Sequence, residues 1–213
     1  MRTLAILCLT LVTSLAAAQN PTPDPRTPDQ LVRETADTLS GLIEGRQQHL
    51  EANPAELYKL VGDVFLPVFD TDYAGRLVLG KHWRTATPVQ RQQFVDTFYD
   101  FLLRSYSRYV LRFEKGKVRI LPGPGGPPDP KRAVVKTEMQ LADGTRLPVH
   151  YSLHQVSAGW RAFDVRIEGI SYVQNYRNQF NAEIGAKGID AVIARLKADT
   201  ARLTTTAPRT AGK

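Results

Sequence analysis

Residues 133–167 read AVVKTEMQLADGTRLPVHYSLHQVSAGWRAFDVRI, and this stretch decides the fold class. Apolar and polar residues alternate in three successive runs, which is the period of strands that are buried on one face. Asp143-Gly144 and Ser157–Gly159 separate the runs, and both contain the glycine that tight turns favour. The stretch therefore predicts an antiparallel meander of three strands, at 133–141, 145–156 and 160–167.

One face of each predicted strand collects the apolar residues. These are Ala133, Val135, Thr137, Met139 and Leu141, then Leu147, Val149, Tyr151 and Leu153, and finally Phe163, Val165 and Ile167. The opposite face carries Arg146, His150, Ser152 and His154, followed by Asp164, Arg166 and Glu168. Pro148 has no N–H to donate, which predicts an irregularity or a free edge there. Residues 117–121 also alternate, so we expect a four-stranded sheet with a long Gly/Pro loop after its first strand.

Helices precede the sheet, and three of them have the same start. Thr27-Pro28-Asp29-Gln30, Asn53-Pro54-Ala55-Glu56 and Thr87-Pro88-Val89-Gln90 each place a capping residue before a proline. The Gln or Glu three residues later bonds back to the cap in such a capping box, and proline at the first helical position loses no hydrogen bond. We expect all three boxes to form.

The helices predicted between and after these starts have apolar stripes at helical spacing. The first carries Leu31, Leu39, Leu42, Ile43 and Leu50, and the second, which Pro67 ends, carries Leu57, Leu60, Val61, Val64 and Phe65. A shorter helix is capped by Asp70 or Asp72 and ends at Gly80, and two more follow at 171–186 and 189–203. Helices, then a meander, then helices predict an α+β fold, with helices covering one face of a curled four-stranded antiparallel sheet.

The ends of the chain are expected to lie outside this domain. Residues 1–18 have a positive start, an apolar run and an Ala-x-Ala cleavage site, which is typical of a secretory signal peptide. Residues 19–26 form a proline-rich leader, 27–203 a single domain, and 204–213 a flexible tail.

Cleavage after residue 18 would remove Cys8, the chain's single cysteine, so the mature protein would have no disulfide and no thiolate chemistry. It would also remove Arg2 and lower the formal net charge from +7 to +6. A basic surface favours anionic partners, and export makes nucleic acid the least suitable of them.

Chemical motifs are weak throughout. "DTDYAG" begins like a calcium loop, but Ala74 and Lys81 stand where that loop needs oxygen ligands. His150 and His154 are about 13 Å apart along one strand, too far to share a metal unaided. P-loop, nucleophile-elbow and zinc-protease motifs are absent from the sequence. We therefore expect no metal site and no catalytic residue, although an enzyme with Asp164 or a histidine as its base remains an alternative.

The most prominent feature of the sequence is the amount of apolar surface on the predicted strands and on the helix that begins at Pro88. The meander offers the residues above, and the helix that begins at Pro88 adds Phe98, Phe101, Leu102, Tyr106 and Tyr109. Arg104, Arg108 and Arg112 follow the same helix at every fourth residue and predict a basic stripe. Periodicity alone leaves two interpretations open, a filled core and an apolar cavity between the helices and the sheet.

Two stretches resemble a known family. They are LGKHWRTATPVQRQQFVDTFYDFLLRSY (79–106) and DVRIEGISYVQNYRNQFNAEIGAKGIDAVIARL (164–196). The second combines Asp-x-x-x-Glu-Gly-x-Ser, an Asn-Tyr-Arg-x-x-Phe helix and a Gly-Ile-Asp that leads into the last helix. In these motifs, and over most of residues 27–200, the sequence resembles the MlaC family, also called the toluene-tolerance family.

The resemblance implies a monomeric periplasmic carrier that shuttles phospholipid between an outer-membrane lipoprotein complex and an inner-membrane transporter with a membrane-anchored substrate-binding subunit. The phospholipid would be cargo, with no other cofactor. The residues expected to contact it are Phe98, Leu102, Tyr106, Val135, Met139, Val149, Tyr151, Phe163, Val165, Ile167, Ile170 and Val173, the last two at the mouth of the pocket. Arg104, Arg108 and Arg112 would face the head group or a protein partner. An envelope adaptor without bound lipid is the other non-enzymatic alternative.

Overall fold

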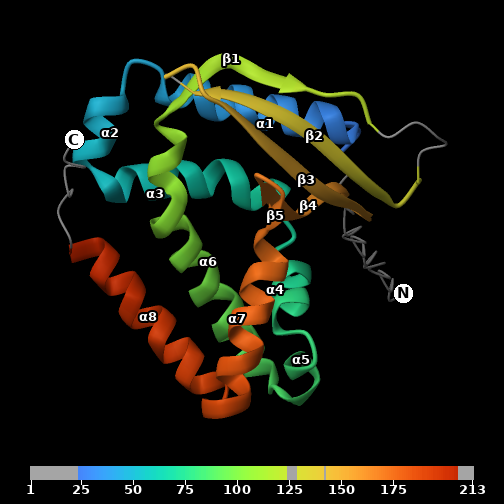
Figure 1. Ribbon diagram of the computed structural model, residues 1–213, viewed down its shortest axis with the longest axis vertical. Coiled ribbons are helices and arrows are strands. Elements are labelled where there is room, and N and C mark those ends of the chain that lie inside the picture. The colour runs from blue at the N-terminus through green and yellow to red at the C-terminus, as the bar shows by residue number, and fades with distance from the viewer. Residues whose placement is uncertain (1–23, 124–128, 142, 206–213) are drawn as a thin grey trace, which may run out of the picture.

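The computed structural model describes residues 24–123, 129–141 and 143–205 and has two parts (Figure 1). One part is an antiparallel sheet with a helix packed along it, and the other is a group of helices. The elements in chain order are α1 (Pro28–Ile43), α2 (Gln47–Ala52), α3 (Pro54–Phe65), η1 (Leu66–Val68), α4 (Thr71–Leu79), α5 (His82–Thr85), α6 (Pro88–Val110), β1 (Phe113–Ile120), β2 (Arg132–Leu141), β3 (Arg146–Val156), β4 (Gly159–Ile167), β5 (Ile170–Ser171), α7 (Tyr172–Lys187) and α8 (Ile189–Thr205).

The predicted α+β class and antiparallel sheet are confirmed, with five strands in place of four. The strands lie in sequence order, β1-β2-β3-β4-β5. The additional strand is two residues long, and it forms because Glu168 and Gly169 both have positive φ angles, 50° and 85°. This tight turn folds Ile170 and Ser171 back onto the end of β4.

Beside β5, the segment before α4 reaches the same edge of the sheet. Phe69 forms an isolated parallel bridge with Ala162 of β4, and the Asp70 N–H donates to the Ala162 carbonyl at 2.7 Å. Both halves of β4 therefore have backbone partners on the side away from β3.

Two of the three predicted capping boxes form. Thr27 and Gln30 exchange bonds of 2.9 and 3.3 Å, and Thr87 and Gln90 exchange bonds of 3.0 and 3.2 Å. The box predicted at Asn53 is wrong, although α3 does begin at Pro54. The Asn53 amide donates backwards to the His49 carbonyl at 2.8 Å because a preceding helix ends there.

The first predicted helix is interrupted, because α1 ends at Ile43 and Gly45 adopts a φ of +72° before α2 begins. Leu50 is still fully buried, but it belongs to α2, and Leu42 is exposed instead of joining the apolar stripe. The Asp70 carboxylate caps α4, as predicted, by accepting from the Tyr73 N–H at 2.9 Å.

A β-bulge in β4 overturns one of the predicted faces. Leu153 pairs with Ala162 while Ser152 pairs with Asp164, so Phe163 is an extra residue in the ladder. Its ring packs edge-on against Tyr73 and His154, at centroid distances of 5.1 and 5.3 Å. Phe163 therefore does not share a face with Val165 and Ile167, because a bulge shifts the alternation by one residue.

Buried side chains of the described residues form three clusters. The sheet cluster joins Leu31 and Val32 of α1 to the inner face of β2, β3 and β4. The helix cluster joins α4, α6, α7 and α8 around Phe94, Phe98 and Phe180. A third, smaller cluster joins α1, α2 and α3 to the end of α6. In the part of the chain that the structure describes, each helix is too short or too polar to cross a bilayer.

Candidate functional site: an apolar cavity between α1 and the sheet

The candidate site is a cavity of about 40 Å³ between α1 and the inner face of the sheet. Its walls are nearly all apolar, since Thr35, Ser40 and Tyr151 are the only lining residues that carry a hydroxyl group. The lining residues are Leu31, Val32, Thr35, Ala36, Leu39, Ser40, Phe65, Val68, Phe69, Val118, Met139, Tyr151, Leu153, Ala162 and Val165. A cavity with such walls favours hydrocarbon over any polar ligand.

The cavity is much smaller than a ligand. Pockets that hold drug-sized molecules measure about 300 Å³ or more. In this conformation the walls meet, and acyl chains would need α1 or the neighbouring segment 65–69 to move away from the sheet. Sliding contacts between aliphatic side chains are suited to such a movement because they are not directional.

The structure brings only part of the predicted lipid site together here. Met139, Tyr151 and Val165 line the cavity. Val135, Val149 and Ile167 belong to the surrounding sheet cluster without lining the cavity. Phe163 lies at the bulge, packed against Tyr73 and His154 instead.

The other predicted residues lie in the helical part of the molecule. Phe98 is buried in the helix cluster, with its ring 4.9 Å from that of Tyr176, while Leu102 and Val173 are partly buried beside it. Tyr106 bonds to the Tyr176 hydroxyl at 2.9 Å. Ile170 is 61% exposed on the short β5 strand. These side chains belong to α6, α7 and the adjoining β5, and none of them lines the cavity under α1.

Two tyrosines of this region, Tyr172 and Tyr176, are neutral at ordinary pH. Burial raises the pKa of Tyr172 to about 12, and the bonded Tyr106 contributes to the shift. Burial also holds the pKa of Tyr176 far above its usual range. Tyr106 and Tyr172 meet edge to face at 5.0 Å. The result is a group of tyrosine rings and hydroxyls beside the apolar side chains of α6 and α7.

Sequence reasoning missed the wall that α1 supplies. Two rows of this helix face the cavity at i, i+4 spacing, Leu31–Thr35–Leu39 and Val32–Ala36–Ser40. The signal was present in the first predicted helix, where Leu31 and Leu39 were placed on one apolar stripe. Thr35 stands between two leucines in the first row, and the small Ala36 and Ser40 follow Val32 in the second. Small side chains on a buried face leave space.

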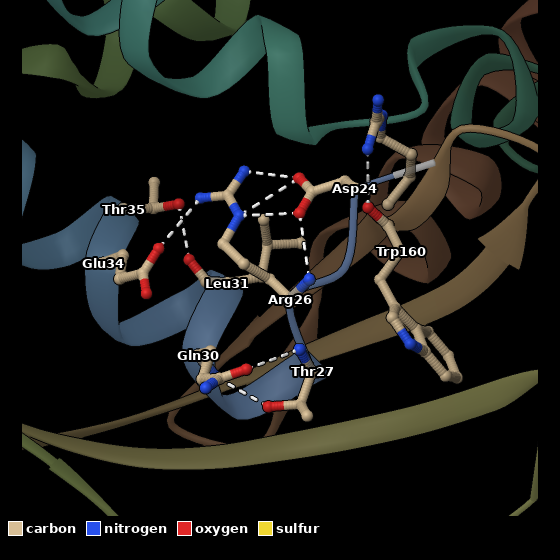
Figure 2. Close-up of polar contacts among 9 residues, drawn as sticks. Asp24, Arg26, Thr27, Gln30, Leu31, Glu34, Thr35 and Trp160 are labelled. Carbon is tan, nitrogen blue, oxygen red and sulfur yellow. Dashed lines mark hydrogen bonds and ion pairs between the residues drawn. The ribbon is translucent and has the colours of Figure 1, made fainter. Parts of the chain in front are cut away.

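The start of α1 is fastened to the β3–β4 turn through Asp24, which Arg26 in turn links to α1; Figure 2 shows the contacts of Arg26. The Asp24 N–H donates to the Ala158 carbonyl at 3.1 Å, and the Arg26 guanidinium reaches both the Asp24 carboxylate, at 2.6 Å, and Glu34 of α1, at 3.4 Å. Arg26 also lowers the pKa of Asp24 to about 2 by hydrogen bonding to its charged form. One end of the cavity wall is thereby tied to the sheet.

The lining segment that ends at Phe69 is fastened to the sheet through the next residue, Asp70. Its carboxylate lies 2.8 Å from His154 Nε2 on β3, and the Tyr73 ring stacks on that imidazole at 4.5 Å. The Arg132 guanidinium donates to the Tyr73 hydroxyl at 3.3 Å. These contacts hold the segment after Phe69 against the sheet.

Polar side chains elsewhere are used in structural bonds. Asp164, the carboxylate considered as a base, is 7% exposed and accepts hydrogen bonds from the Ser171 hydroxyl at 2.7 Å and the Val173 N–H at 3.0 Å. It therefore joins β4 to the start of α7. Among the described residues, acidic, histidine and cysteine side chains form no group of three suited to a metal ion.

The predicted basic stripe has other contacts. Arg104 pairs with Asp100 at 2.8 Å and lies over the Tyr58 ring at 5.3 Å. Arg112 lies beyond the end of α6 and pairs with Asp143 at 2.9 Å. Arg108, in the last turn of α6, is half-buried. A role for these three cations toward a head group or partner stays a prediction.

Comparison with known proteins identifies the family. The protein family described as "MlaC protein" matches residues 33–198, which is most of the chain. The chain belongs to the MlaC family. Toluene tolerance protein ttg2D of Pseudomonas putida is 28% identical over 188 residues, covering 88% of this chain and 86% of the relative. The intermembrane phospholipid transport system binding protein MlaC of Haemophilus influenzae is 22% identical over 209 residues, covering 90% and 88%.

A solved phospholipid-binding protein has the same fold. The phospholipid-binding protein from Ralstonia solanacearum, determined in complex with a phospholipid, superposes with a TM-score of 0.77 at 24% identity. The match covers 84% of this chain and 100% of that one. The resemblance noted in the two sequence stretches is thus confirmed, and so is the fold that it implied.

Proposed function

We propose that this member of the MlaC family is a periplasmic phospholipid carrier, with diacyl lipid as cargo and no catalytic step. The observation that carries the proposal is the apolar cavity between α1 and the sheet, which lies in the fold shared with a phospholipid-binding protein. The names of the relatives, which include a phospholipid transport binding protein, point the same way.

Energetics explain why such a carrier is needed. Two acyl chains contain about 28 methylenes, and at about 0.8 kcal/mol each their exposure to water would cost about 20 kcal/mol. A cavity as apolar as a bilayer would make transfer from the membrane nearly neutral. Direction would then come from the partners, which we propose to be an outer-membrane lipoprotein complex and an inner-membrane transporter with a membrane-anchored substrate-binding subunit.

We propose two walls for the acyl chains. Met139, Tyr151 and Val165, with Val135, Val149 and Ile167 around them, form the sheet wall that α1 now covers. Phe98, Leu102, Tyr106, Val173 and the exposed Ile170 form a second apolar surface on the helical part, available once the two parts separate. Phe163 is left out of this proposal, because the bulge places its ring against His154.

The test is lipid content after expression with export. The purified protein would be extracted with organic solvent and analysed by mass spectrometry, expecting about one diacyl phospholipid per chain. Val165→Asp places a charge on the cavity wall, and we expect it to abolish loading. Val134→Asp is the matched control, since Val134 is 50% exposed on the neighbouring strand β2 and does not line the cavity.

Equal loading of both variants would contradict the assignment of the cavity. A lipid-free wild-type protein would contradict the carrier function altogether and favour the second candidate, a non-enzymatic envelope adaptor. The observation that supports this second candidate is the small volume of the cavity, because a closed interior needs no cargo. Circular dichroism of each variant would establish that the fold is retained.

A further inference from the structure

A row of three basic residues crosses the outer face of the sheet. Lys136 on β2 lies directly opposite His150 on β3, and His150 lies directly opposite Arg166 on β4. Neighbouring strands are about 4.8 Å apart, so the row is about 10 Å long. Basic side chains placed directly across from one another in a sheet repel whenever both are charged, and folding alone gives no reason to line them up.

The row faces away from the cavity. Its members alternate along their strands with inward residues such as Val135, Val149 and Val165. Lys136 and His150 are half-buried and Arg166 is exposed. A lipid head group associated with the cavity under α1 would therefore lie on the other side of the sheet from these three side chains.

Two acidic side chains near the row are engaged with other partners. Glu138, two residues along β2 from Lys136, lies 3.5 Å from Arg146. Asp164, two residues along β4 from Arg166, accepts bonds from Ser171 and Val173. Arg119 on β1 lies opposite Glu138 and adds another exposed cation to this face. Glu168, two residues along the chain from Arg166, is also exposed and brings one more carboxylate close to the row. The four cations Lys136, Arg166, Arg119 and Arg146 still outnumber the carboxylates of Glu138 and Glu168, so the charge around the row is net positive.

We infer that the Lys136–His150–Arg166 row is a docking surface for an acidic protein partner, whose carboxylates span the three strands. Fixed, evenly spaced cations suit fixed carboxylates on a helix or strand, whereas a fluid anionic membrane is satisfied by scattered Lys and Arg. The described sheet also exposes few large apolar side chains there, Val134 and Ile170, for insertion into lipid. This inference is independent of the carrier function.

His150 makes the docking pH-dependent. Burial lowers the pKa of its imidazole, and the nearby Lys136 and Arg166 lower it further. The free protein therefore holds His150 neutral at neutral pH. Carboxylates brought close to the row would favour the charged imidazole and raise its pKa. Proton uptake would accompany binding, and binding would strengthen as the pH falls.

A fluorescent peptide of about ten glutamates serves as the probe, with binding to the intact protein measured by anisotropy at low salt. We expect the Lys136→Gln/Arg166→Gln variant to bind about five- to tenfold more weakly. The control Arg33→Gln/Lys197→Gln removes the same charge from exposed positions on α1 and α8, and should lose at most about twofold. His150→Gln should remove most of the pH dependence between pH 6 and 8.

Two outcomes would overturn the inference. Equal losses in the two double variants would mean that binding follows net charge alone. Failure of the peptide to bind, with row-dependent binding of phosphatidylglycerol vesicles instead, would make the surface a membrane contact. An NMR titration of His150 gives a second readout, since its pKa must rise when the peptide is added. All variants are surface changes, and urea unfolding would confirm that their stability is unchanged.

Discussion

Gly159 is where the fastening of α1 to the sheet is most easily tested. It begins β4 with a φ of +107°, which side chains rarely adopt, and it touches the backbone of the leader segment. A Cβ at this position would lie 2.7 Å from the Asp24 Cβ and 2.8 Å from the Asp24 carbonyl oxygen. Gly159→Ala therefore adds both backbone strain and a steric clash.

The two costs can be separated. Backbone strain at such a φ costs about 1–3 kcal/mol and persists whatever surrounds the residue. The clash adds about 1–3 kcal/mol as long as Asp24 stays in place, because backbone atoms have little freedom to yield. If the segment detaches, the clash disappears, but the bonds from Asp24 to Ala158 and Arg26 disappear as well. In either case the penalty should exceed the strain alone.

The assay is urea unfolding of four proteins, with and without Gly159→Ala, in a longer chain that begins at Gln19 and in a shorter chain that begins at Arg26. The longer chain is called the mature chain below, after the expected cleavage site. The shorter chain lacks Asp24, so the substitution should cost only the strain there. We expect the penalty to be larger in the mature chain by about 1–2 kcal/mol. Equal penalties in the two chains would refute the contact between Asp24 and the β3–β4 turn.

Three further predictions concern single interactions. Because folding lowers the pKa of Asp24 from 3.8 to about 2, its carboxylate stabilises the protein fully above pH 4, and this stabilisation disappears as the pH falls through 2. The free energy of unfolding, measured in urea titrations, should be about 1 kcal/mol higher for the wild type than for Asp24→Asn at pH 7. Near pH 2 the two proteins should be almost equally stable. Tyr176→Phe should cost about 1 kcal/mol by removing the bond to Tyr106, and a double-mutant cycle with Tyr106→Phe should show the coupling; additive losses would contradict it. Thr87→Ala should lower stability by about 1 kcal/mol through loss of the α6 cap, whereas Thr87→Ser should not, as thermal unfolding would show.

Local chemistry explains which parts of the fold were predictable. The starts at Thr27 and Thr87, the cap at Asp70 and the alternating faces of β2 and β3 depend on neighbours within a few residues, and the structure has them as expected. The box at Asn53 failed because another helix ends at the same residue and offers its carbonyl. This competition depends on where the preceding helix ends, and the hydrophobic periodicity does not specify that residue.

The site was less predictable, for two physical reasons. A bulge is invisible to an alternation pattern, so Phe163 was placed on the wrong face of β4. A cavity is the difference between two packed surfaces, and the sequence indicates each surface but not their separation. Met139 and Val165 were found because any inward strand residue is near the cavity, whereas Thr35 and Ala36 of α1 were not singled out.

The partners of β4 along its outer edge have a consequence for the protein in its compartment. Unpaired strand edges invite other chains to add to a sheet, which is a route to aggregation. Phe69 and Asp70 occupy one half of this edge, and Ile170 and Ser171 occupy the other. The opposite edge strand, β1, exposes Lys117 and Arg119, whose charges discourage a neighbour. With both edges of the sheet blocked in this way, the protein avoids polymerising with its own copies.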